Sequence, residues 1–215
     1  MRIKAILSIL LSLCLFPKVN AAKDQTPEKE FRFRGYTGGM LLHTGYAESK
    51  KFPVFSGGTL VENGQVKGMP MGLGGMIKFG FGTEKDILRV GGEGYSSNLH
   101  YGKTGSYFHV GWGGLLIDYI HITEGRVYPF AGVTFGGGGV KNVMVSSGAL
   151  DDFETDPALI RKYMLFTIAP FAGIEISISK RFRVVLKADY MINLGKAQPD
   201  YASGPRLHAG FLFCK

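Results

Sequence analysis

The sequence contains little cysteine and a single tryptophan. Its 215 residues include two cysteines, Cys14 and Cys214, and one tryptophan, Trp112. Cys14 lies in an N-terminal segment that we expect to be cleaved, which leaves Cys214 alone and excludes an intrachain disulfide. A disulfide-stabilised secreted scaffold is therefore excluded, and stability has to come from the closure of a sheet.

The apolar run near the N-terminus is too short for a transmembrane helix. It covers residues 5–16, fewer than the roughly 17 to 25 residues that a spanning helix needs, and Pro17 ends it. Basic residues precede the run. For cleavage after Ala21, the small residues Val19 and Ala21 occupy the minus-three and minus-one positions. These features predict a signal peptide at 1–21. Residues 22–30 have no apolar periodicity and predict a flexible periplasmic lead-in.

Positive charge is not concentrated in any part of the chain. The formal net charge of +8 falls to +5 once the three basic residues of positions 1–21 are removed. The remaining basic residues are scattered through turns and alternate strand positions, and the chain is predicted to be exported. These observations argue against nucleic acid as a partner.

Sequence motifs for cofactors and metals are also missing. The run Gly136–Gly139 lacks the Lys and Ser/Thr of a phosphate-binding loop, so its glycines are expected to relieve crowding in a strand. The spacing of an EF-hand loop is missing from the acidic cluster of Asp151, Asp152, Glu154 and Asp156. We therefore predict no cofactor and no metal site.

The feature that dominates the chain is an alternation of apolar and polar residues between 161 and 194. Even positions from Met164 to Ile178 are apolar, and the alternation resumes from Phe182 to Leu194 after a basic turn at Lys180. A period of two predicts strands, so this stretch predicts a long β-hairpin. Each arm exceeds the roughly 9 to 11 residues with which a strand crosses a bilayer.

The rest of the mature chain repeats this pattern. We expect eight strands whose connections are in turn long, short, medium, short, long, short and long. The medium connection is expected at 99–106 and the long ones at 47–67, 146–161 and 195–205. Short periplasmic turns and longer extracellular loops on opposite rims are typical of outer-membrane barrels. The sequence therefore predicts an all-β, eight-stranded, antiparallel up-and-down transmembrane β-barrel over residues 31–215.

Charged residues share the parity opposite to the apolar stripe. A soluble lipocalin-like barrel would point these charges to water, whereas a membrane barrel packs them inside, because a lipid-facing charge costs about 2 to 4 kcal/mol at the midplane. Aromatic residues near strand ends favour the membrane alternative. The predicted interior charge network comprises Arg32, Arg34, Lys78, Arg89, Glu93, Glu175, Arg183, Lys187 and Asp189.

Within this network, a turn centred near Arg181 would place Glu175 roughly opposite Lys187. We expect a cross-strand ion pair there, worth about 0.2 to 1 kcal/mol. A gated ion path is the alternative use of interior charges. It is disfavoured because side chains just fill an eight-stranded barrel.

The signal peptide, the eight amphipathic strands and the alternating connections resemble the small outer-membrane barrels of the OmpA/OmpX type. The resemblance covers residues 31–215 and rests on pattern, without a diagnostic motif. It implies a monomer in the outer membrane of a Gram-negative bacterium, in contact with outer-membrane lipid and lipopolysaccharide and inserted by the barrel-assembly machinery. One departure is visible, because such barrels usually end in an aromatic residue, whereas Phe213 is followed by Cys214 and Lys215.

Function on such a scaffold is carried by loops, so we expect a structural or surface-interaction role such as adhesion. The aromatic candidates for contact with an extracellular ligand are Tyr46, Phe52, Phe55, Phe153 and Tyr201. A narrow channel is one alternative.

A lipid-modifying enzyme is another alternative and would need a nucleophile beside a histidine. The nearest approach in the sequence is Ser106 with His109. No histidine has a serine two residues away, so we predict no enzyme and no catalytic residues.

Overall fold

The computed structural model describes residues 31–56, 59–102, 105–145, 158–196 and 198–215. The expected signal peptide and lead-in lie outside these residues and stay predictions. The described strands are β1 (Arg32–Gly45), β2 (Ala47–Glu48), β3 (Phe52–Ser56), β4 (Thr59–Gly64), β5 (Lys67–Gly68), β6 (Met71–Gly82), β7 (Asp86–Tyr101), β8 (Ser106–His121), β9 (Val127–Val145), β10 (Ala158–Ser179), β11 (Phe182–Tyr190), β12 (Ile192–Asn193) and β13 (Pro205–Cys214).

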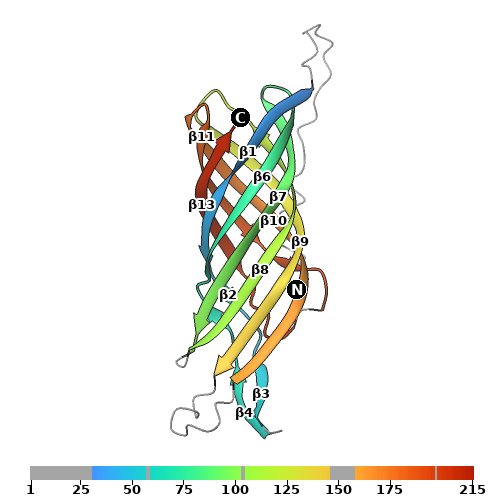
Figure 1. Ribbon diagram of the computed structural model, residues 1–215, viewed down its shortest axis with the longest axis vertical. Coiled ribbons are helices and arrows are strands. Elements are labelled where there is room, and N and C mark those ends of the chain that lie inside the picture. The colour runs from blue at the N-terminus through green and yellow to red at the C-terminus, as the bar shows by residue number, and fades with distance from the viewer. Residues whose placement is uncertain (1–30, 57–58, 103–104, 146–157, 197) are drawn as a thin grey trace, which may run out of the picture.

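The long strands of the described chain close into a ring (Figure 1). The hydrogen-bonded order is β11-β13-β1-β6-β7-β8-β9-β10-β12, and β10 also pairs with β11. Since β12 continues β11 beyond Met191, the ring has eight strand positions, all paired antiparallel. The predicted eight-stranded, antiparallel up-and-down barrel is confirmed.

The connections sort by rim as the sequence predicts. The turns at 83–85, 122–126 and 180–181 lie at the rim where β1 begins and β13 ends. The longer connections at 46–70, 146–157 and 194–204 join strands at the opposite rim, which we call the extracellular rim. Figure 1 shows β3 and β4 extending past this rim.

Two predicted connections are shorter than expected. The loop expected at 99–106 shrinks to 102–105, because Leu99 continues β7 and pairs with Phe108 of β8. β10 begins at Ala158, inside the connection that was expected to run to residue 161. The polar connection at 47–67 is also more regular than expected, since it contains β2, β3 and β4 and joins β5.

The apolar face of the strands points outward. Met164 is 76% exposed and Phe166 is 64% exposed, whereas Leu165 between them is buried. A soluble calyx would show the reverse. A closed antiparallel barrel with an apolar outer wall and a charged interior is the architecture of outer-membrane proteins.

The barrel interior holds two apolar clusters. One lies toward the rim of the termini and is composed of Leu41, Met76, Leu116, Ile120, Phe130, Phe171, Val185 and Leu212. The other lies toward the extracellular rim and includes Ala47, Phe52, Val66, Leu99, Phe108, Val110, Met144, Leu165, Met191, Tyr201 and Ala202. Between and beside them lie buried charges.

Candidate functional site

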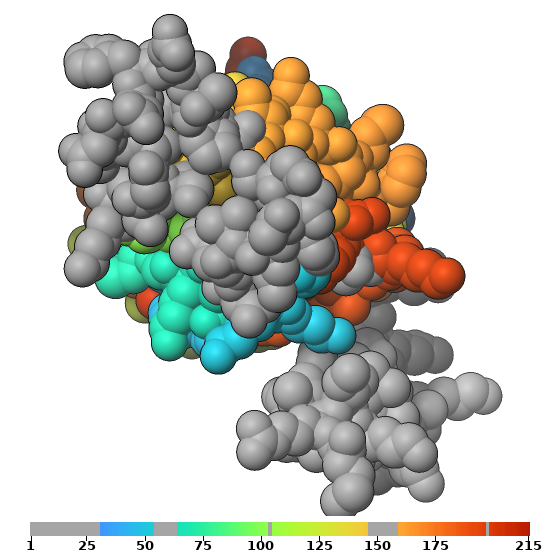
Figure 2. Space-filling model, turned by 90° about the horizontal axis from the view of Figure 1, so that it is seen from below, coloured from blue at the N-terminus to red at the C-terminus, as the bar shows by residue number. Residues whose placement is uncertain are grey.

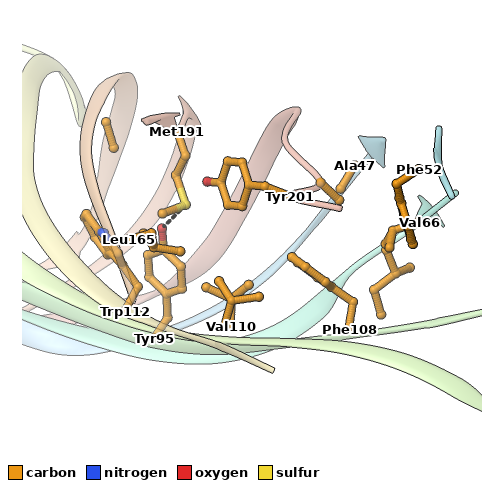
Figure 3. Packing of buried hydrophobic residues seen from close by; sticks show 14 of the residues in the cluster. Ala47, Phe52, Val66, Tyr95, Phe108, Val110, Trp112, Leu165, Met191 and Tyr201 are labelled. Atoms are coloured by element: carbon orange, nitrogen blue, oxygen red, sulfur yellow. Dashed lines mark hydrogen bonds between the residues drawn. The ribbon is translucent and has the colours of Figure 1, made fainter. Parts of the chain in front are cut away.

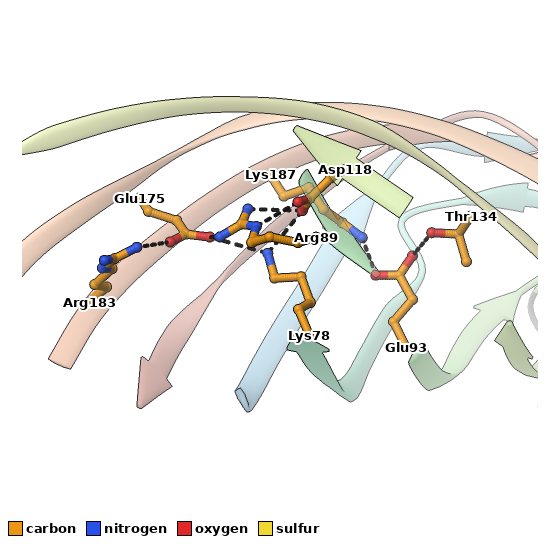
Figure 4. Close-up of polar contacts among 8 residues, drawn as sticks. All are labelled: Lys78, Arg89, Glu93, Asp118, Thr134, Glu175, Arg183 and Lys187. Carbon is orange, nitrogen blue, oxygen red and sulfur yellow. Dashed lines mark hydrogen bonds and ion pairs between the residues drawn. The ribbon is translucent and has the colours of Figure 1, made fainter. Parts of the chain in front are cut away.

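A buried ion cluster occupies the part of the barrel interior nearer the termini (Figure 4). Arg89 of β7 contacts Asp118 of β8, with its Nε 2.5 Å from Oδ1, and contacts Glu175 of β10 at 2.6 Å through Nη1. Lys78 of β6 donates to both carboxylates, at 3.0 and 3.2 Å. Arg183 of β11 donates to the second oxygen of Glu175 at 2.9 Å. These contacts tie β6, β7, β8 and β11 to β10, the strand of Glu175, across the interior.

A second ion cluster lies farther toward the extracellular rim. Lys187 of β11 donates to Glu93 of β7 at 2.5 Å, and Thr134 donates to the other oxygen of that carboxylate at 2.6 Å. Asp189 accepts from Arg206 of β13 at 2.7 Å. These side chains are all buried, so each charge depends on its partner for the interactions that water would otherwise supply.

The structure brings together most of the predicted network but not every member. Arg32 is exposed at the rim, and Arg34 donates through Nε to the carbonyl of Gly82 at 2.9 Å. The expected pair of Glu175 with Lys187 is wrong. Their strands are in a register that sets Glu175 opposite Val185 and Lys187 opposite Gly173. Each side chain instead reaches across the interior to β7, Glu175 to Arg89 and Lys187 to Glu93.

Three buried members were missed by the sequence reasoning. Asp118, Arg206 and His208 all face inward and contact the predicted charges. Arg206 and His208 alternate with outward Leu207 and Ala209, so the parity of the last strand could have identified them. Asp118 was hidden because apolar residues occupy both parities of β8, including inward Leu116 and outward Leu115.

Aromatic rings line the ion clusters. Lys78 lies 5.0 Å from the centroid of Phe130, and Arg206 lies 4.4 Å from that of Tyr95. The ring of His43 lies tilted by 37° against that of His208, with centroids 5.2 Å apart, and neither ring nitrogen of buried His43 has a hydrogen-bond partner. Cations over ring faces are stabilised further where water is excluded.

The extracellular half of the interior is closed by an apolar cap, which we define as the cluster containing Phe52, Val66, Tyr201 and the inward side chains beneath them (Figure 3). Phe52 and Val66 come from the first long connection, and Tyr201 comes from the last one. They pack with Phe108 of β8 and Met191. The cavity left under the cap is only about 40 Å³, room for about one water molecule.

The cap corrects the prediction about loop aromatics. Phe52 is 1% exposed and Tyr201 is 8% exposed, so both are core residues and cannot meet a ligand. The physical reason is that the loops fold inward over apolar side chains at the mouth. Tyr46 is exposed and donates to Glu48 at 2.9 Å. Phe55 is placed only through its backbone in β3, and Phe153 lies outside the described residues.

Polar contacts fix the last connection to the barrel wall. Buried Asp200 accepts from Asn142 of β9 at 3.0 Å and lies 3.3 Å from Arg161 of β10. Burial raises the pKa of Tyr201 to about 12, so this phenol is neutral in the cap. A backbone bridge between Glu48 and Ser203 joins the first and last connections. Figure 2 shows this rim from outside, with cyan residues of the first connection and orange residues of β10 on its surface.

The residue pair considered for an enzyme is not brought together. Ser106 is buried and accepts a hydrogen bond from the backbone of Val145, whereas His109 faces outward and contacts Asn98 at 2.7 Å. Alternation of side chains along β8 puts the two on opposite faces of the wall. Within the described ranges, no three His, Cys, Asp or Glu side chains are arranged to hold a metal ion. The described residues contain no helix long and apolar enough to cross a membrane.

Several solved structures resemble this fold. The outer-membrane protein Ail of Yersinia pestis, solved with the heparin analogue sucrose octasulfate, is 10% identical, with a TM-score of 0.48 over 84% of this chain and 99% of that one. Neisserial surface protein A is 14% identical, with a TM-score of 0.48 over 83% and 95%. The N-terminal barrel domain of Pseudomonas aeruginosa OprF is 15% identical, with a TM-score of 0.42 over 82% and 99%.

These similarities concern the fold alone. No protein-family model matches the chain, and no curated protein matches it in sequence. The closed ring and its apolar outer wall describe a small barrel, and its specific work has to be argued from its own residues.

Proposed function

We propose that the protein is a closed, non-conducting barrel of the Gram-negative outer membrane that holds the extracellular segment 46–70 for recognition at the cell surface. The observation that carries this proposal is the filling of the interior at two levels. Ion clusters occupy the middle of the barrel, above a cavity of about 400 Å³ at the rim of the termini, and the apolar cap occupies the extracellular mouth. A solute path would have to break buried ion pairs or displace Phe52 and Tyr201.

The first connection has the properties of a presented surface. β3 and β4 pair as a hairpin beyond the rim, with Phe52 opposite Gly64. The base of the segment is fixed, because Ser49 donates its backbone N–H to Val66 and Val66 donates back to the Ser49 hydroxyl at 2.9 Å. Exposed Lys50 and Lys51 lie directly before the hairpin. A segment held in one conformation loses less entropy on binding than a free loop.

Conductance in planar bilayers tests the closed interior. The purified protein is expected to insert without stepwise currents, and a porin measured in the same bilayers shows that the assay detects open channels. Regular single-channel steps from the intact protein would contradict the proposal and favour the narrow-channel alternative.

Trimming the hairpin tests recognition. In the variant, residues 53–63 are replaced by a short Gly-Ser turn that joins Phe52 to Gly64, which are already neighbours in the sheet. Cells displaying the intact protein are expected to adhere to immobilised gelatin more than cells displaying the variant. Adherence to heparin is compared with a second variant, Lys50→Gln/Lys51→Gln, because these exposed basic residues remain when the hairpin is trimmed. Equal adherence of the two, with equal surface amounts, would contradict a recognition role for this segment.

A further inference from the structure

The outward face of β9 and β10 carries charge at only one level. On β10, Lys162 is followed toward the opposite rim by Met164, Phe166 and further apolar side chains. On β9, Lys141 is the sole charge among the outward residues of the strand as described. Both lysines lie near the strand ends at the extracellular rim, where the apolar wall meets the outer leaflet.

The two lysines and a histidine form one row across three strands, which we call the cation row. The register sets Lys141 opposite His109 of β8 on one side and opposite Lys162 of β10 on the other. Like charges directly opposite each other destabilise a sheet. Within the described part of the chain no carboxylate lies within ion-pair distance of either lysine, and Lys141 instead lies 5.3 Å from the ring of Tyr107. An external anion between the two lysines would offset their repulsion.

A groove runs directly below the cation row, toward the middle of the membrane. It has a volume of about 530 Å³ and is lined by His109, Lys141 and Lys162 above and by Gly111, Gly139 and Met164 beneath. Gly111 and Gly139 are register partners that leave the wall without side chains, and a Cβ at Gly139 would meet nothing within 4 Å. The groove is therefore basic at its outer end and apolar at its inner end.

We propose that this groove binds a lipid that carries a phosphate monoester, the headgroup chemistry of lipopolysaccharide. The phosphate lies between Lys141 and Lys162, and the adjoining acyl chain lies over Gly139 against Met164. A dianionic phosphate monoester matches two opposed ammonium groups better than the single charge of a phospholipid diester. The proposal rests on the position of the barrel in the outer membrane and is independent of recognition by residues 46–70.

Binding of a truncated lipopolysaccharide that retains its lipid phosphates tests the proposal. The full-length protein in zwitterionic detergent is titrated with this probe, and the Kd is compared with that of the double variant Lys141→Gln/Lys162→Gln. The variant is expected to bind about a hundredfold more weakly, because it loses two charged contacts to phosphate and each is worth about a factor of ten. The matched control is Lys180→Gln/Arg181→Gln, which removes two exposed charges at the opposite rim and is expected to change the Kd less than about twofold.

Two further measurements test whether binding depends on the lipid phosphate and on the open groove. Dephosphorylated lipopolysaccharide is expected to bind the intact protein as weakly as the phosphorylated probe binds the double variant. Gly139→Leu, which has room for its side chain, is expected to keep the heat-modifiable barrel but weaken lipid binding by filling the groove. Equal binding of phosphorylated and dephosphorylated probe, equal loss in the control variant, or equal affinity for phosphatidylglycerol would overturn the proposal.

Discussion

The indole of Trp112 on β8 points into the barrel opposite Gly138, its register partner on β9. Its Nε1 donates to the hydroxyl of Thr167 on β10, at 2.5 Å, so one side chain spans the width of β9. Gly136 and Gly138 leave the inner face of β9 free for the ring, since a Cβ at Gly136 would lie 2.8 Å from the indole. The glycine run thus makes room for the largest side chain in the barrel.

Substitutions of inward-facing and outward-facing glycines in that run are expected to have different effects on barrel assembly. In Gly138→Val, the new Cβ would overlap the backbone oxygen of Gly111, so the barrel should assemble poorly or not at all. In Gly139→Val, the side chain points outward into open space and the barrel should assemble normally. Gel mobility with and without boiling measures assembly. Equal assembly of the two variants would show that the inner face of β9 is not crowded.

Loss of a buried carboxylate is expected to be costly. Glu175→Gln leaves Lys78, Arg89 and Arg183 with less compensating charge in the interior, which should lower the free energy of unfolding by about 3 to 5 kcal/mol. The matched control is Glu124→Gln, which removes an exposed partner of Lys85 and should cost about 1 kcal/mol or less. Urea unfolding in vesicles, followed by Trp112 fluorescence, gives both values. Similar values for the two variants would show that Asp118 and water make up for the negative charge lost with Glu175.

Removal of the cap anchor is expected to free the first connection without unfolding the barrel. Phe52→Ala empties a buried site in the cap, so trypsin should cleave after Lys50 or Lys51 faster than in the unchanged protein. Met69→Ala, in the same connection but at a 67% exposed position, should leave the cleavage rate unchanged. Mass spectrometry of the fragments identifies the cut. If both variants were cleaved at the same rate, Phe52 would not anchor the segment.

The position of Cys214 gives a test of orientation in the membrane. This thiol lies half-buried at the end of β13, at the rim of the termini, which we expect to face the periplasm. A membrane-impermeant maleimide should therefore label it in broken cells and not in whole cells. Lys50→Cys in a Cys214→Ser background should be labelled in whole cells. The reverse pattern would mean that the barrel is inserted the other way.

Much of the architecture was readable from the sequence because strand alternation is local. Even positions from 164 to 178 are all apolar, so the outward face of β10 followed from sequence alone, and the turn at Lys180 was placed between β10 and β11. The inward parity of Glu93, Lys187 and Asp189 followed in the same way. It was not necessary to know which strands pair in order to predict the number of strands, the direction of each face and the order of short and long connections.

Only the tertiary structure decided which charges meet and where the loops lie. Glu175 reaches Lys78 and Arg89 across the interior, rather than Lys187 on the neighbouring strand, because ring closure brings five strands to one point that no sequence spacing encodes. Likewise, Phe52 and Tyr201 become core residues only because two distant connections meet over one mouth. Alternation fixes the face of a side chain, whereas register and closure fix its partner, and these depend on the whole ring.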